Sequence, residues 1–553
     1  MPYKKNNIRV TVPHSSGSDL SHRNSGTIQC GTLTPLLVEE VIPKTRCHLR
    51  IPEIVQLPPL VTDAYMNLKL KHEAFFVPMR LCCRSFENWF SEFPKRVAQY
   101  NVQSGASVTS FYDVKAALPV FQLDSTLPSN YYSQGSLLDF LGYKIDRIQG
   151  NEDISPLSMI AYHLIWQEYY RNPRVQNPAF VPEMVLSTTS SSNYRVPSLP
   201  FYEFRYAGTG ISANNVYVAN STNVASQFNC ADGTSIFSLR QRNFGLDYFT
   251  GARVSPQQGT ASSVSMSIPS GATSTSFTIA QLRAANSLQQ FRERNNLPSS
   301  RFVDQIYARY GVVLSDGVAQ RPIFIGSSTF DVVTRGVDQT SPGGVASQPN
   351  PFNTVGSNYG KAYAVGDGTL IDDFEVKEPG FIMVIQSLVP EVTYSSGIAP
   401  YLKRYLADGS VVEMATPVLQ NIGDEPIYDW QLGDTGGNTA SIFGYQDRYG
   451  TFMFHSNECH SEFRDGNTLD TFVLQRSFGS GTTLNSSFLE IPTNYLDQLF
   501  VTSAQSMGFS AWYDAKLEWK ITHPLQEFSI PSLQDPAYEH GQSISIRRNG
   551  QIL

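Results

Sequence analysis

The sequence has little charge and few of the features that mark polycations, membrane proteins or common enzymes. Of its 553 residues, only 16% are Asp, Glu, Lys or Arg, against about 25% in an average globular protein. Acidic residues outnumber basic residues by 48 to 41, for a net charge of -7. A coat of phosphate-binding side chains over the whole surface is therefore excluded. Aromatic residues reach 12%, and low charge with many aromatic side chains is typical of protein–protein interfaces.

Cysteine pairs and long apolar runs are also missing. The six cysteines, at positions 30, 47, 82, 83, 230 and 459, form no Cys-x-x-Cys pair, which excludes zinc ribbons and thioredoxin-like motifs. Adjacent Cys82 and Cys83 are a poor disulfide framework, so we predict free thiols in a reducing compartment. The N-terminus has no apolar signal segment. Apolar runs such as 381–385 are far shorter than the roughly 20 residues of a membrane helix.

Motifs for catalysis and cofactor binding are absent or incomplete. Residues 356–362, GSNYGKA, approach a phosphate loop, but they have one residue too few between the glycines and Ala362 where Ser or Thr is needed. We find no dinucleotide fingerprint, no G-x-S-x-G elbow and no H-E-x-x-H helix. The sequence therefore predicts no enzyme activity and no cofactor.

One cluster of metal-ligand residue types occurs in the sequence HSNECH. It contains His455, Cys459 and His460, and imidazole and thiolate are both zinc ligands. The preceding Phe452–Phe454 has the character of a strand, and no fourth ligand is apparent. Polar residues at the end of a strand are the preferred interpretation, and the three residues stay weak metal candidates.

Strand patterns gather at the two ends of the chain. Alternating or continuous apolar residues predict strands near 36–42, 47–51, 66–77, 380–385, 445, 452–454, 471–473 and 517–521. Helices are predicted at 86–93, from the Ser155 cap and Pro156 to 170, at 282–291, and at 302–310 before Gly311. Segments 206–235, 260–278 and 336–369 are rich in Ser, Thr, Asn, Gly and Ala, and are predicted to be long surface loops.

These patterns predict a mainly β protein. Strands at both ends with helices and loops between them suit an antiparallel β-sandwich with large insertions. We expect a single domain over residues 33–530, with its helical insertion at about 85–200. An extended N-terminal arm is expected over residues 1–32 and a C-terminal tail over 531–553.

Positive charge is concentrated near the N-terminus. Residues 1–50 hold seven Lys or Arg and three Asp or Glu, a net of +4, and the remainder is therefore net -11. Basic residues near a chain end can neutralise phosphates without reading base sequence. The candidate DNA-contacting residues are Lys4, Lys5, Arg9, Arg547 and Arg548. The alternative is that both ends are ordinary solvated termini.

Five distinctive blocks stand in order along the chain: FFVPMRL (75–81), AYHLIWQEYYR (161–171), DYFTGA with SPQQG (247–259), RYGV with QRP (309–322), and GYQDRY with FR and LD (444–470). Taken together and in this order, they resemble blocks of the major capsid proteins of the Microviridae, and of gokushoviruses in particular. The family tryptophan before the DYFT block is Phe244 here. The insert that builds threefold protrusions in gokushoviruses corresponds to 260–278, which is short.

The resemblance implies a structural protein of a small bacteriophage. The expected fold is an eight-stranded antiparallel jelly roll, and the expected assembly is a T=1 icosahedral shell around circular single-stranded DNA. The implied partners are copies of the chain itself, the packaged DNA, internal scaffolding and minor or pilot virion proteins, and a host-cell surface receptor. The implied locations are the virion and, during assembly, the host bacterial cytoplasm.

A second class of function is kept as the alternative. β-Sandwiches with polar loops often bind sugars, so a secreted or surface glycan-binding or glycan-active protein is the competitor. It would need an export signal or a pair of carboxylates in a cleft, and the sequence shows neither.

Overall fold

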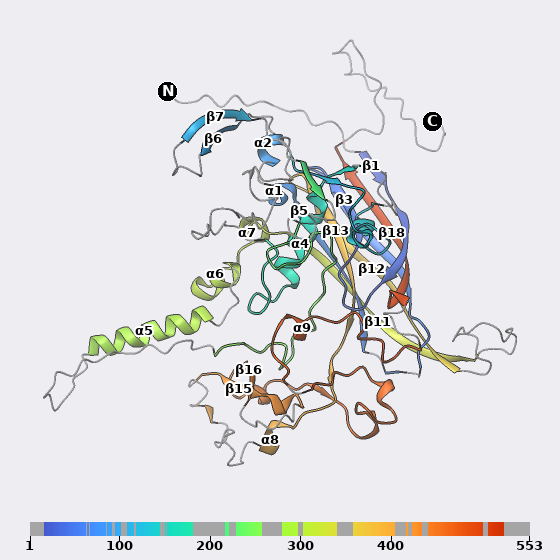
Figure 1. Ribbon diagram of the computed structural model, residues 1–553, viewed down its shortest axis with the longest axis vertical. Coiled ribbons are helices and arrows are strands. Elements are labelled where there is room, and N and C mark those ends of the chain that lie inside the picture. The colour runs from blue at the N-terminus through green and yellow to red at the C-terminus, as the bar shows by residue number, and fades with distance from the viewer. Residues whose placement is uncertain are drawn as a thin grey trace, which may run out of the picture.

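The computed structural model describes residues 16–61, 64–65, 67–83, 86–90, 95–100, 108–114, 118–143, 150, 152–180, 216–219, 228–256, 279–296, 302–339, 358–403, 416–417, 423–433, 441–479, 481–501 and 507–524. The described part is mainly β, built around a strongly curled antiparallel sheet (Figure 1). This agrees with the predicted β-sandwich class. No helix among these residues is long and apolar enough to cross a membrane.

The large sheet has eight strands along one path, with a ninth pairing beside it. The order is β1 (Ser16–Asp19), β18 (Ala511–His523), β4 (Arg46–Gln56), β12 (Asn358–Glu375), β11 (Ile323–Gln339), β5 (Leu68–Pro78), β13 (Gly380–Pro390) and β3 (Thr34–Val41). β2 (His22–Ile28) also pairs with β18. All of these pairs are antiparallel.

The long strand β11 joins the two halves of the sheet. Its first part, Ile323 to Val332, pairs with β5, and its second part, Val333 to Gln339, pairs with β12. The first and last thirds of the chain therefore meet: β4 from the N-terminal part lies between β18 and β12. Strand pairing between distant segments is what closes the curled sheet.

Alternation of side chains fixes which sheet face is buried. β4 and β18 show nearly strict alternation of buried and less buried residues, as expected for strands with one face on a core. Leu49, Ile51, Leu517 and Trp519 point into the core between the sheet halves and are at most 1% exposed. Period-2 patterning thus predicts these strands correctly.

β5 and β13 are instead buried on both faces. Phe76 and Val384 pack in the first core, whereas Phe75 and Met383 pack in a second core on the other side of the sheet. α4 (Leu157–Ile165) covers that second face together with parts of 118–180 and 228–237. A helical insertion thus acts as a second layer.

The remaining short helices and strands lie outside the large sheet. Short helices are α1 (Met79–Cys82), α2 (Phe86–Phe90), α3 (Leu137–Phe140), α7 (Asp316–Ala319), α8 (Pro400–Lys403) and α9 (Ser486–Leu489). The small strands are β6 (Lys95–Tyr100), β7 (Val108–Val114), β8 (Val120–Leu123), β9 (Glu152–Ile154), β10 (Val216–Ala219), β14 (Thr393–Tyr394), β15 (Glu425–Tyr428), β16 (Ile442–Gln446) and β17 (Asn457–Glu458).

Two predicted helices are confirmed, as α5 (Ile279–Asn296) and α6 (Phe302–Tyr310). Gly311 follows α6 with a left-handed φ of 69°, so it ends the helix as predicted. The helix after Ser155 differs in its cap: Pro156 occupies the N-cap position without a side-chain hydrogen bond, and Leu157 is the first helical residue. Beyond Ile165 the chain widens into a π-helical turn, Trp166–Tyr170 (η2).

Three predictions are wrong in detail. Phe452–Phe454 and Thr471–Val473 are not strands: 3₁₀ turns occupy Gly450–Phe452 and Asp470–Phe472. The segment 336–369 is strand at both ends, because β11 and β12 extend into it. Residues 16–28, assigned to the arm, form β1 and β2 of the sheet. The predicted loop at 260–278 lies outside the described residues.

Candidate functional site

One hollow of the described structure lies where the end of α4, the segment after it, residues 228–243 and α9 meet. Its volume is about 310 Å³, at the lower end of the range for ligand pockets. Trp166 and Leu239 supply apolar wall, and Gln176, Arg240 and Glu490 supply polar wall. The question is whether these polar groups are available to a ligand or already bonded to one another.

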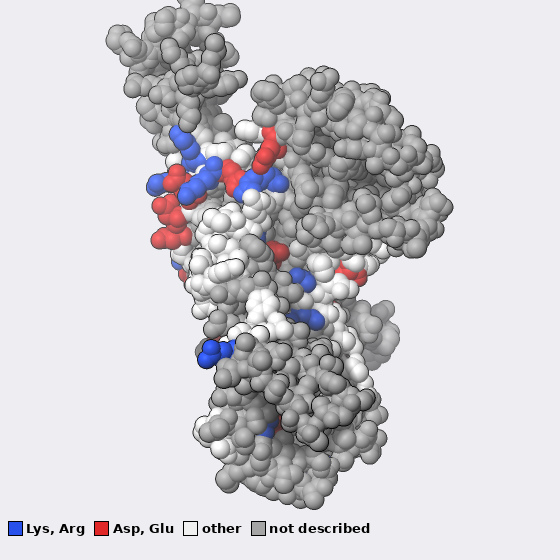
Figure 2. All heavy atoms as spheres, turned by 90° about the vertical axis from the view of Figure 1, so that its left-hand side faces the viewer, with Lys and Arg blue, Asp and Glu red and all other residues white. Residues whose placement is uncertain are grey.

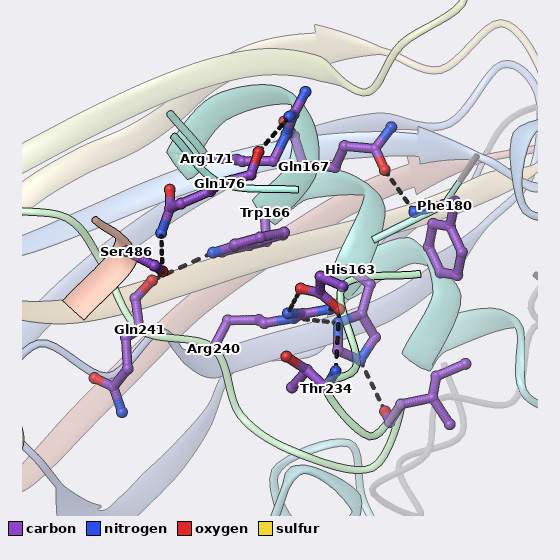
Figure 3. Close-up of polar contacts among 12 residues, drawn as sticks. His163, Trp166, Gln167, Arg171, Gln176, Phe180, Thr234, Arg240, Gln241 and Ser486 are labelled. Atoms are coloured by element: carbon purple, nitrogen blue, oxygen red, sulfur yellow. Dashed lines mark hydrogen bonds and ion pairs between the residues drawn. The ribbon is translucent and has the colours of Figure 1, made fainter. Parts of the chain in front are cut away.

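Arg240 is the centre of a buried network on this wall (Figure 3). Its side chain is 4% exposed and forms an ion pair with Asp232. Its Nε donates to His163 Nδ1 at 2.9 Å. The guanidinium carbon lies 4.2 Å from the centre of the Trp166 ring, a favourable cation–π geometry. The charge of Arg240 is therefore matched within the protein.

His163 is held in one neutral tautomer by its two partners. Its Nδ1 accepts from Arg240, so the proton lies on Nε2, which faces the Ile236 carbonyl oxygen at 2.8 Å. Burial and the neighbouring Arg240 charge lower the pKa of His163 well below its usual value. With both ring nitrogens bonded inside the protein, this histidine has the geometry of a structural group rather than of a general base.

Gln176 joins three segments of chain at the other side of the hollow, namely its own segment, the one at Asn243, and α9 with its C-cap Glu490. Its amide nitrogen donates to Glu490 Oε1 at 2.8 Å and contacts Ser486 Oγ at 3.3 Å (Figure 3). The amide oxygen accepts from the Asn172 backbone N–H at 2.7 Å. Asn243 bonds to the same side chain. These hydrogen bonds connect the insertion to α9. The polar groups on this side of the hollow are therefore bonded to one another.

A second arginine fastens the sheet to this region. Arg242 binds Glu73 of β5, with Nη1 2.5 Å from Glu73 Oε2, and donates to Ser387 Oγ of β13 at 2.9 Å. The Tyr170 hydroxyl donates to the same Glu73 oxygen at 2.6 Å. Paired charges that are largely buried are costly to break, so this pair fixes the position of the insertion on the sheet.

A histidine–carboxylate pair lies deeper, inside the sheet core. His72 Nε2 of β5 is 2.7 Å from Glu53 Oε2 of β4, and both side chains are 0% exposed. Gln386 of β13 donates to the other Glu53 oxygen at 2.5 Å. Such a pair resembles part of a catalytic dyad in composition, but its complete burial keeps any substrate away. Its geometry fits a link between strands.

The predicted DNA-contacting residues Lys4, Lys5, Arg9, Arg547 and Arg548 all lie outside the described residues. The structure does, however, fix where both termini leave the sheet. Ser16 pairs with His523 at the shared end of β1 and β18, and the Ser18 hydroxyl lies 2.9 Å from His523 Nε2. The segments that carry the two sets of basic residues therefore start from one point of the fold.

The weak metal candidates are not brought together. His455 is exposed, with Nδ1 3.0 Å from the Ser456 carbonyl oxygen. His460 Nε2 is 3.5 Å from Glu458, and Cys459 is buried, with its thiol 3.1 Å from Gln475 Oε1. The described residues contain no group of three or more His, Cys, Asp or Glu side chains arranged to hold a metal ion.

Sequence reasoning missed the polar network around Arg240 and Gln176. His163 lies within the helix predicted after Ser155, and its partner Arg240 is 77 positions away. The one available signal was an arginine in the otherwise uncharged run IFSLR at 236–240. A charge among apolar residues indicates a buried pair, but it does not identify the partner.

The outer surface differs from this bonded interior. On the face shown in Figure 2, the described charged side chains gather in the upper part with both signs side by side, and much of the described surface below is uncharged. Large apolar side chains are exposed in several places, including Tyr65 at 69%, Tyr310 at 72% and Val313 at 80%. Exposed apolar groups in clusters mark surfaces for other proteins.

Comparison with known proteins places this architecture. Residues 7–533 match the family described as capsid protein (F protein). "Capsid protein VP1" of Chlamydia phage 1 is 25% identical, over 95% of this chain and 96% of the relative. The VP1 capsid proteins of Bdellovibrio phage phiMH2K and Spiroplasma virus 4 are 24% and 22% identical, over 92% and 96% of this chain and 93% and 97% of their own length.

Proposed function

The chain belongs to the capsid protein (F protein) family, and from this premise we propose that it builds a T=1 icosahedral shell around a circular single-stranded DNA genome. That it is a structural capsid protein of the microvirus type, a component of the virion that assembles with copies of itself, follows from the family and its phage relatives. The observation that carries the proposal is the match over nearly the whole chain, combined with the curled antiparallel sheet.

The physical properties of the chain support a role as a wall subunit. Largely buried ion pairs stabilise the insertions: Arg240–Asp232 lies within one insertion, and Arg242–Glu73 connects that insertion to the sheet, so that the contact surfaces keep one shape. A charged fraction of 16% limits repulsion between neighbouring copies. Apolar burial then drives association at about 25 cal/mol per Å², most of which is offset by the cost of ordering the subunits.

We propose a structural role without catalysis. The buried histidines His72 and His163 are bonded inside the protein and give a substrate no access. The competing function, a glycan-binding or glycan-active β-sandwich, is not favoured by the family. We propose that residues 33–530, together with β1 and β2, form one jelly-roll domain, that residues 531–553 form the tail, and that assembly takes place in the host bacterial cytoplasm.

Assembly itself is the first test. The purified chain, alone and with its internal scaffolding protein, is examined by light scattering and negative-stain microscopy. We expect uniform particles of the size of a small phage. A stable monomer under both conditions, with measurable affinity for glycans, would overturn the capsid proposal in favour of the alternative.

We propose that the basic termini face inward and contact the packaged DNA. Lys4, Lys5 and Arg9 lie in the segment before Ser16, and Arg547 and Arg548 lie in the segment after His523, and Ser16 pairs with His523. Cations near a common anchor can neutralise phosphates, and Tyr3 can stack on bases. The exposed loops would lie on other parts of the shell than these termini. There they would contact the minor or pilot proteins and the host receptor.

The arm is tested by replacing Lys4, Lys5 and Arg9 with Gln, beside deletion of residues 2–9. Both changes should lower the amount of packaged DNA and release the DNA at a lower salt concentration, because each lost cation removes one phosphate contact and the counterion release that favours binding. Replacement of exposed Lys377 by Gln is the control. Normal packaging and normal salt resistance in the triple variant would remove the arm from DNA binding and leave the shell proposal standing.

A further inference from the structure

We propose that the C-terminal segment after Pro524 folds back over the outer face of the large sheet and covers an apolar patch on the same copy. This sheet patch consists of Trp512 of β18, Ile54 of β4, Val365 of β12 and Val333 of β11. The inference concerns a single copy, so it goes beyond the proposed shell and does not depend on it. Two observations carry it: the exposed apolar face, and the length and starting point of the chain that follows β18.

Strand register places the members of the sheet patch side by side. Neighbouring strands pair residues of this face directly opposite one another, as Ile54–Val365, Trp512–Gln56, Gln56–Tyr363 and Val333–Tyr363. The Trp512 ring N–H also donates a hydrogen bond to Gln56 Oε1 at 3.1 Å. Because residues two apart on a strand share a face, the sheet patch is continuous across four neighbouring strands.

The sheet patch lies on the outward side of its strands. The residues that alternate with it pack in the first core and are at most 3% exposed, namely Val55, Ala364, Val332 and Tyr513. The patch residues themselves are 64% exposed for Val365, 48% for Ile54, 47% for Val333 and 39% for Trp512. A sheet with one face on a core normally carries polar side chains on its other face. Four large apolar side chains together on that face therefore indicate an interaction surface.

The helical layer of the protein packs on a different part of the sheet. α1 and α4 contact β5 and β13, α3 contacts β3, and α7 contacts β11. In Figure 1, α4, α6 and α7 lie to the left of the sheet, whereas β12 and β18 lie on its right-hand side. The layer that buries the second face of β5 and β13 is therefore not the cover of the sheet patch.

The starting point and length of the C-terminal segment allow it to reach the sheet patch. β18 begins beside Trp512 and ends at His523, and the 29 residues 525–553 follow Pro524. At about 3.3 Å per residue, the distance from His523 back to Trp512 is about 36 Å, whereas the extended segment can span about 95 Å. Residues from about 535 onward can therefore lie on the patch.

This reachable part of the segment carries apolar side chains suited to cover the patch. They are Tyr538, Ile544, Ile546, Ile552 and Leu553. One serine separates Ile544 from Ile546, so an extended chain puts both isoleucines on one face. Arg547 and Arg548 follow directly. Docking therefore presents these two arginines from the face of the sheet rather than from a free chain end.

The N-terminal segment is the other chain end at this sheet, and its apolar residues are too close to their anchor. Ser16 pairs with His523, so this segment also starts about 36 Å from the sheet patch. Its alternating apolar residues, Ile8, Val10 and Val12, lie at most eight positions before Ser16, which spans about 26 Å. They stop short of the patch on the same copy, so the C-terminal segment is the occupant.

Chymotrypsin cleavage of the full-length, unassembled chain tests the docking. The rate of cleavage after Tyr538 is followed by mass spectrometry. We expect Ile54→Lys with Val365→Lys to raise this rate about tenfold, because cleavage follows the population of the released segment. The matched control is Leu246→Lys with Val254→Lys, which adds the same charge at residues that are 86% and 57% exposed and lie outside the sheet. The control should leave the rate unchanged.

A second measurement follows the sheet patch from the side of the segment. Ile544→Asp with Ile546→Asp should release the segment and raise the acrylamide quenching of Trp512 fluorescence. The same pair in a chain that carries Trp512→Phe should cause no rise, which assigns the signal to this tryptophan. Circular dichroism and thermal unfolding of every variant should match the unsubstituted chain, because all of the substituted patch residues are exposed.

The outcomes distinguish this inference from the proposed function. Cleavage after Tyr538 that is equally fast in the unsubstituted chain and the patch variant overturns the docking, and so does unchanged quenching of Trp512. Protection that disappears on dilution places the segment on a second copy and also overturns the proposal. None of these results bears on the shell. Conversely, a chain that forms no particles but protects Tyr538 through the sheet patch overturns the shell and leaves this inference standing.

Discussion

The Nε atom of Arg240 donates a hydrogen bond to Nδ1 of His163 across 2.9 Å, and neither side chain has appreciable contact with solvent. A protonated imidazole could not accept this bond, and it would place a second positive charge beside the guanidinium. The folded insertion therefore requires His163 to be neutral. The first prediction follows from this link.

Stability should fall on acidification because of His163. The pKa of His163 is lowered in the folded protein, so the unfolded chain binds a proton below about pH 6.5 that the native state does not bind. The contribution is fully present above pH 6.5 and is lost as pH falls, by up to about 1.4 kcal/mol per pH unit. Urea unfolding at pH 7.5 and 5.5 measures it. His163→Gln should show a shallower pH dependence, and an unchanged dependence would contradict the prediction.

Breaking the Arg240–Asp232 pair should cost far more than breaking a surface pair. Asp232→Asn leaves a guanidinium that is 4% exposed without its counter-ion, and we expect a loss of about 3–5 kcal/mol in unfolding free energy. The control is Asp514→Asn, whose partner Arg23 is 73% exposed, with an expected loss below about 1 kcal/mol. Chemical denaturation measures the unfolding free energy of the two variants. Equal losses would show that the buried pair contributes no more to stability than the exposed pair.

Gly31 should tolerate no side chain. Its φ is 71°, and an added Cβ would lie 2.5 Å from the Ile491 Cβ. Gly466 has a similar φ of 80°, but a Cβ added there would have no atom within 4 Å. Its substitution therefore measures the cost of the backbone conformation alone. We expect Gly466→Ala to lose about 1–2 kcal/mol and Gly31→Ala to lose about 1–3 kcal/mol more from overpacking. Thermal unfolding of the two variants gives the difference, and equal losses would mean that Ile491 moves aside freely.

The six cysteines should be unreactive in the native protein. All six are free and buried, and burial raises the pKa of Cys47 to about 12 and the pKa of Cys230 to about 11. Since the thiolate is the reactive form, a chromogenic disulfide reagent at pH 8 should label no thiol before unfolding and six in denaturant. Rapid labelling of one or more thiols in the native protein would contradict this.

Local pattern predicted some elements well and others poorly. The alternation in β4 and β18 and the stop at Gly311 need only neighbouring residues, and both were predicted correctly. The aromatic runs at 452–454 and 471–473 satisfy a strand pattern equally well, yet each overlaps a 3₁₀ turn. A segment forms a strand only if another strand pairs with it, in addition to having the right side-chain pattern. Whether such a neighbouring strand is present depends on residues far away in the sequence.

The family, the mainly β class and the absence of recognisable enzyme motifs were available from the sequence alone, because ordered blocks, side-chain periodicity and motif spacing are properties of the linear chain. Tertiary structure decided what those blocks do together. In it, Ser16 pairs with His523, so the segments that lead to the two basic termini leave the sheet at the same point. It also brought His163 and Arg240 into contact. These relationships join residues far apart along the chain, so no local pattern can encode them; they exist only once the sheet has closed.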